Sequence, residues 1–169
     1  MMHFSGSRIG RKRRRTRGQS LVEFALVLPL FMLLLFGIID ISRYVFTLNT
    51  LNQVARESAR VGSVQTWPTE CAALARDTCI DRVARGRALA VNLNTGLVTT
   101  AAPSSAGVQA VCRHLATNGT QSVVAFSDCR SNDLLTVTLH SNFTLVTPGV
   151  GQFLQKLNLT GESQITLNN

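Results

Sequence analysis

The sequence has few side chains that could stack on nucleobases and no signature of a catalytic centre. It contains one Trp and one Tyr in 169 residues, which leaves little stacking surface for single-stranded nucleic acid. No G-x-S-x-G, H-E-x-x-H, Walker or dinucleotide-binding pattern occurs. Neither His114 nor His140 has an acid or a nucleophile at motif spacing. We therefore expect no enzyme activity, no catalytic residue and no cofactor.

Acidic residues are missing from the first seventeen positions, which hold seven of the 17 Lys and Arg residues. The remainder of the chain carries ten cations and nine acids, so the net charge of +8 reflects the N-terminus alone. A hydrophobic fraction of 45% with only 15% charged residues argues against a disordered chain. The length suits one small folded domain behind a basic leader, residues 1–18.

Charged and strongly polar side chains are also missing between Phe24 and Ile39. A helix needs about 20 apolar residues to cross a bilayer, and we expect a span over about 21–42. Seven cations precede this run, whereas Arg43 is the only cation in the fifteen residues after it. The positive-inside rule then places the N-terminus in the cytoplasm and the C-terminal part outside it.

Two other interpretations of the N-terminus are weaker. A cleaved secretory signal would end at a small-x-small site, but the segment after Ile39 reads DISRYVF. A DNA-binding arm would lie against the bilayer without a folded cytoplasmic partner, so we expect no nucleic acid as a partner.

Glu23 is an acid at the cytoplasmic edge of the span, where a charge is costly. With Ser20 it fits the S-x-x-E capping box, which would satisfy free N–H groups at the start of a helix. Cleavage after Gly18 would instead create an α-ammonium on Gln19, one helical turn from the carboxylate. The two roles are compatible.

These residues carry a resemblance to a known family. The segment RGQSLVEFALVLPL at 17–30, followed by GIID at 37–40 and ARESAR at 55–60, resembles the TadE-like family of pseudopilins of the Tad/Flp (tight adherence) type IV pilus system. The resemblance implies that prepilin peptidase cuts between Gly18 and Gln19 and that Glu23 is the fifth residue of the mature chain. Phe24 stands where that branch commonly has Tyr.

The same resemblance implies a minor subunit or an assembly factor, since major Flp pilins are far shorter. It places the chain in a bacterial cytoplasmic membrane as a single-pass protein with a periplasmic or extracellular head. Its partners would be the membrane, prepilin peptidase, other pilin or pseudopilin subunits and the Tad secretion machinery. The alternative is an uncleaved, signal-anchored protein whose head binds an extracytoplasmic ligand.

The helix should continue beyond the membrane, over 19–66, until Trp67-Pro68 stops it. A stripe of apolar or small residues alternates steps of three and four along Ile41, Tyr44, Leu48, Leu51, Ala55, Ser58 and Gly62. The side chains of the stripe become smaller toward its end. This favours a globular layer that packs closely against the helix, and argues against an isolated coiled-coil stalk. The acid-then-base pairs Asp40–Arg43 and Glu57–Arg60 are compatible with a polar outer face.

Pro29 lies inside the span, where neighbouring groups can compensate for its missing hydrogen bond. A bend at this residue would let helices pack side by side during assembly.

Residues 67–169 should form an exported α+β head. We expect a short helix over 78–90, strands over 108–115, 121–126 and 135–145, a short helix over 150–157 and a last strand over 161–167. Alternation of apolar and polar residues is clearest over 135–139, which indicates an antiparallel sheet.

Four cysteines, Cys71, Cys79, Cys112 and Cys129, all lie in the region placed outside the cytoplasm, where disulfides form. Three pairings are possible. Proximity in the chain favours the pairing Cys71–Cys79 with Cys112–Cys129, but the spacing alone does not decide among the three pairings. The first pair would require a helix break, because eight residues of helix span about 12 Å. The spacings match no common zinc pattern, so we expect no metal.

Overall fold

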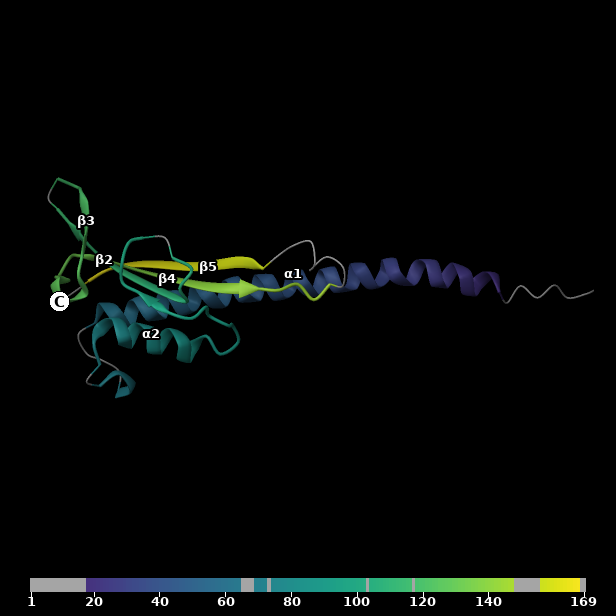
Figure 1. Ribbon diagram of the computed structural model, residues 1–169, viewed down its shortest axis with the longest axis horizontal. Helices are drawn as coiled ribbons and strands as arrows, with labels where there is room; N and C mark the ends of the chain where they lie inside the picture. The colour runs from purple at the N-terminus through teal and green to yellow at the C-terminus, as the bar shows by residue number, and fades with distance from the viewer. Residues whose placement is uncertain are drawn as a thin grey trace, which may run out of the picture.

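One long helix, α1 (Gln19–Ser63), carries a small head along its C-terminal half (Figure 1). The computed structural model describes residues 18–64, 69–72, 74–102, 104–116, 118–147 and 156–167. The 45 residues of α1 form a rod of about 70 Å at 1.5 Å per residue. The helix ends three residues before the predicted boundary at 66, and the expected stop at Trp67-Pro68 lies outside the described residues.

Burial changes sharply along α1. Every side chain from 18 to 35 is exposed, and the first buried one is Asp40. Leu51, Ala55 and Ser58 of the predicted stripe are then fully buried, whereas Ile41 stays 65% exposed. The head therefore covers only the C-terminal half of the stripe, where the residues are smallest and allow the closest approach.

The head contains a five-stranded sheet. Its strands are β1 (Leu97–Val98), β2 (Val108–Leu115), β3 (Gln121–Val124), β4 (Leu134–Phe143) and β5 (Leu157–Thr166). The order is β1-β2-β4-β5, with β3 also paired to β2. All these pairs are antiparallel except β1–β2. The sheet is therefore mixed, whereas the sequence predicted an antiparallel one. The prediction missed β1 because two residues are too few to show an alternating pattern.

Helices α1 and α2 (Arg76–Arg87) pack together and close one face of the sheet. The alternating residues Leu135, Val137 and Leu139 of β4 are fully buried against them. Each such side chain contributes about 1.5–3 kcal/mol through its burial. The core is formed by α1, α2, β2, β4 and β5 together, so the C-terminal half of α1 is part of the head's fold.

Other element boundaries differ from the expected ones by a few residues. The helix expected over 78–90 is α2, at Arg76–Arg87, and the strand expected over 121–126 ends at Val124 before a 3₁₀ turn, η2 (Phe126–Asp128). The strand expected over 135–145 is β4, which ends at Phe143.

The end of the chain differs more. The short helix expected over 150–157 falls mostly outside the described residues, but Leu157 already belongs to β5. This strand therefore starts four residues earlier than predicted. Leu159 and Gly161 are buried between exposed neighbours, and this period-two pattern extends the strand backward.

Two disulfides join Cys71 with Cys79 and Cys112 with Cys129, which are the two local pairings. Cys71 lies at the end of a 3₁₀ turn, η1 (Thr69–Cys71), and Cys79 lies in α2, which begins at Arg76. The helical structure is therefore interrupted between the two cysteines. This break brings the Cα atoms of Cys71 and Cys79 to 5.3 Å, a separation that a single straight helix does not allow.

Candidate functional site

Gly18 lies at the start of α1, and its carbonyl oxygen accepts a hydrogen bond from the N–H of Val22 at 3.2 Å. Gln19 is the first helical residue, and no side chain in the described part of the chain caps the helix. The expected capping box is therefore wrong. A capping side chain belongs to the residue just before the first helical one, which here is Gly18, whereas Ser20 already lies within the first turn.

The carboxylate of Glu23 lies one turn beyond Gln19, a rise of about 6 Å along the axis. Glu23 is exposed, and it forms no ion pair within the part of the chain that the structure describes. Phe24 beside it is 64% exposed. The acid is thus free to meet a cation from outside this part of the chain.

The N-terminal half of α1 presents a continuous apolar surface. Leu21, Leu26 and Leu30 are 69%, 74% and 71% exposed, and Pro29 lies within this half without ending the helix. The helix is long and apolar enough to cross a membrane. An apolar surface of this extent marks a membrane or protein contact, because isolated soluble domains rarely expose one.

Asp40 joins this apolar segment to the head. Its carboxylate accepts hydrogen bonds from the N–H of Val146 at 2.9 Å, the N–H of Thr147 at 2.9 Å and the Thr147 hydroxyl. The side chain is only 4% exposed as a result. These hydrogen bonds fix the segment that follows β4 to α1 at Asp40, close to the end of the predicted span.

The sequence predicted that two ion pairs lie on a polar outer face of α1. This prediction is correct for Glu57–Arg60 and wrong for Asp40–Arg43. Glu57 and Arg60 form the expected pair on the surface, at 3.4 Å. Arg43 lies 3.5 Å from Asp40, but Asp40 faces the head instead of solvent. The sequence marks Asp40 as the first acid after the apolar run. It does not show the hydrogen-bond partners of Asp40, which lie more than 100 residues away in the chain.

Aromatic residues surround the same junction. The rings of Tyr44 and Phe143 meet edge to face, with centroids 5.9 Å apart. The guanidinium carbon of Arg43 lies 5.4 Å from the centroid of the Phe143 ring, a favourable cation–π distance. Phe143 therefore holds both α1 side chains at the base of the head.

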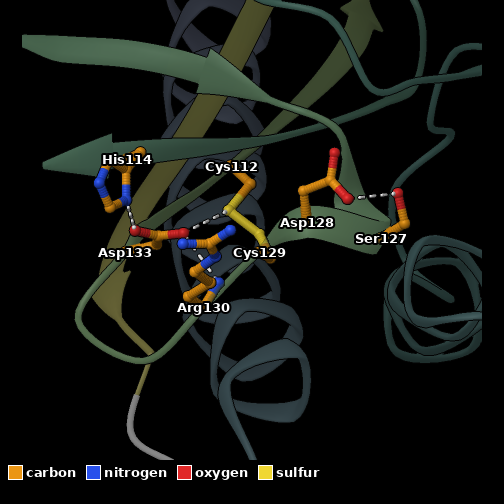
Figure 2. The surroundings of a disulfide bond; sticks show 7 residues. All are labelled: Cys112, His114, Ser127, Asp128, Cys129, Arg130 and Asp133. Carbon is orange, nitrogen blue, oxygen red and sulfur yellow. Dashed lines mark hydrogen bonds and ion pairs between the residues drawn. A yellow bond between two sulfur atoms is a disulfide. The ribbon is translucent and has the colours of Figure 1, made fainter.

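A second polar cluster lies at the far end of the sheet, beside the Cys112–Cys129 disulfide (Figure 2). Asp133 is almost fully buried and lies 2.6 Å from Nδ1 of His114. It also accepts a hydrogen bond from the N–H of Arg130 at 2.8 Å. The cluster fixes the turn before β4 against β2, and sequence spacing did not reveal it.

The sulfur atoms of Cys112 and Cys129 lie close to the carboxylate of Asp133, as ligands of a metal ion would. Metal binding by cysteine requires the thiolate, and both sulfurs are joined in the disulfide. The oxidised head therefore offers no thiolate at this place, and the group is structural.

Comparison with known proteins identifies the helix and not the head. Residues 18–60 match the family model described as TadE-like protein. No curated protein and no solved structure matches the chain. The match covers α1 from Gly18 almost to its end, and therefore includes Glu23, Pro29 and Asp40.

Proposed function

Because its long helix is a TadE-like segment, we propose that the chain is a minor pseudopilin or assembly protein of a Tad/Flp pilus system. In this proposal one helix spans the bacterial cytoplasmic membrane, and prepilin peptidase cuts between Gly18 and Gln19. The disulfide-bonded head then lies on the periplasmic or extracellular side. The observation that carries the proposal is the match over residues 18–60, which begins at the proposed cut.

The geometry of α1 supports this assignment. The apolar half of the helix is exposed on all sides, so it can contact lipid before assembly and other subunits after it. The head leaves this half uncovered, which keeps it available for packing against neighbouring helices. The function is then one of assembly, carried by helix contacts and not by catalysis.

Glu23 provides the charge in this account. Within an assembly of apolar helices an unpaired carboxylate is costly, and the α-ammonium of a processed Gln19 offsets this cost. The partner could be the chain's own terminus or that of a packed neighbour. Phe24 and Pro29 lie on the same exposed segment, where Pro29 would set the local helix direction for side-by-side packing.

The assembly role is tested with Glu23→Ala, in cells that hold the complete pilus machinery. We expect the variant to insert into the membrane like the wild type, because an acid has been removed from an apolar helix. Its cross-linking to other pilin subunits should fall at least about tenfold, through loss of the charge pair. The measurement is carbonate extraction for insertion and cross-linking followed by co-purification for assembly.

Glu162→Ala is the matched control, because Glu162 is an exposed acid on the head. It should change neither readout. Normal cross-linking of Glu23→Ala would contradict the assembly role. A full-length chain that inserts normally and never joins other subunits would instead favour an uncleaved, signal-anchored binding protein.

A further inference from the structure

Two hollows of opposite character meet where α1 leaves the proposed membrane span. The first is an apolar groove of about 320 Å³, lined on α1 by Leu33, Gly37 and Ile41 and on the head by Leu145 and Leu157. The second is a polar pocket of about 460 Å³ that contains Arg43. Phe143 lines both, so the two hollows are neighbours.

The apolar groove is open to the surroundings of the helix. Gly37 contributes no side chain, and no atom of the described residues lies within 4 Å of where its Cβ would be. The one charged group among the lining residues, Asp40, has its carboxylate oxygens occupied by Val146 and Thr147. The groove is therefore apolar in effect. Its helical side belongs to the last turns of the span, at the depth of acyl chains in the outer leaflet.

The polar pocket contains Arg43, which the proposed membrane orientation places at the level of the lipid headgroups. The side chain of Arg43 is 46% exposed, although Asp40 lies 3.5 Å from one of its nitrogens. A guanidinium has five N–H donors, so donors remain for an anion. Asn92 and Asn142, whose amides can also donate hydrogen bonds, line the same pocket and are exposed.

We propose that these two hollows bind one anionic phospholipid of the outer leaflet. Its phosphate would meet Arg43 in the polar pocket, and an acyl chain would lie in the groove beside Gly37. Charge complementarity and the continuity of the groove with the lipid-facing helix favour a lipid over a second copy of the chain. The inference rests on the membrane orientation of the proposed function.

The test uses the full chain in mild detergent, titrated with phosphatidylglycerol or phosphatidylcholine and examined by native mass spectrometry. We expect one tightly held phosphatidylglycerol per chain. Arg43→Gln should weaken its binding about fivefold to tenfold and abolish the preference over phosphatidylcholine. Arg43→Lys should keep the preference, because it keeps the charge.

Gly37→Leu provides an independent variant, since the space around its Cβ position is open and a leucine side chain there would occupy part of the groove. It should weaken binding of both lipids, because it excludes the acyl chain. Arg60→Gln removes a 72% exposed guanidinium elsewhere on α1, and Ala25→Leu adds bulk at another exposed position of the span. Both controls should bind as the wild type does.

Flotation with vesicles separates failure of this inference from failure of the proposed function. A chain that does not float with vesicles would overturn the membrane proposal itself. A chain that floats, but whose lipid binding is unchanged in both Arg43→Gln and Gly37→Leu, would overturn the lipid site alone. Unchanged lipid binding with an altered dimer fraction in Gly37→Leu would assign the groove to a second copy, and also overturn it.

Discussion

At the scale of single residues, Asp40 joins the helix to the head by hydrogen bonds. A buried carboxylate is stable only when its hydrogen-bonding capacity is used. Here two backbone N–H groups and one hydroxyl supply the donors. The residue that ends the apolar run therefore also fixes where the chain after β4 meets α1.

Asp40→Asn tests this role. The substituted amide can still accept a hydrogen bond on one side, but its NH₂ group would face backbone donors. We expect the head to lose about 1–3 kcal/mol of stability, measured by thermal unfolding of the full chain in detergent with circular dichroism. Glu57→Gln, which removes the partly exposed ion pairs of Glu57 with Arg60 and Arg87, should cost less than about 1 kcal/mol. Equal stability of the two variants would show that Asp40 does not hold the junction.

His140 gives the head a dependence on pH. It lies on β4, its Nε2 is buried without a hydrogen-bond partner among the residues that the structure describes, and burial lowers the pKa of its imidazole below 6.5. The unfolded chain therefore takes up a proton at a higher pH than the folded chain does. Stability should be constant above about pH 7 and should fall as the pH drops through 6.5.

The slope should level off below the lowered pKa of the folded state, where both forms are protonated. Urea unfolding of the full chain in detergent between pH 5 and pH 8 measures it. His140→Gln should flatten the curve in this window. A slope that persists unchanged in His140→Gln would assign the titration to another group.

At the scale of elements, the head is held on α1 by a close crossing of the helix and β5. A Cβ atom on Gly161 would lie 2.6 Å from the backbone carbonyl carbon of Leu51. Gly161 therefore permits an approach that no other residue would allow.

Gly161→Ala should destabilise the head by about 1–3 kcal/mol through overpacking. Gly86→Ala is the matched control, because Gly86 lies inside α2 with open space around its Cβ position. That change should stabilise by about 0.5–1 kcal/mol, since alanine is the better helix former. Thermal unfolding of the two variants measures both, and a tolerated Gly161→Ala would contradict the close crossing.

The same elements show what sequence can predict. The bounds of α1 follow from the apolar run and the stripe, and β2 and β4 follow from alternation, because these patterns are local. The parallel pairing of β1, the early start of β5 and the partners of Asp40 depend on residues distant in the chain. Glu23 and Gly18 were recognised by their pattern, whereas Asp133 and His114, 19 residues apart, required the fold.

At the scale of the whole molecule, the chain has three regions with separate physical roles. Residues 1–18 carry the excess of positive charge, the exposed half of α1 is apolar, and the head shares one core with the C-terminal half of α1 and holds two disulfides. If the leader is removed after Gly18, the remaining chain has ten cations and nine acids. The basic charge would then serve orientation and processing only, and the mature protein would be nearly neutral.

The intact mass of the membrane-extracted protein tests this account most directly. In cells that contain prepilin peptidase, we predict a mass corresponding to a chain that begins at Gln19. Gly18→Leu should retain the leader and so the larger mass. A wild-type mass that still includes the arginines at 11–17 would contradict the central claim that this is a processed, pilin-like subunit.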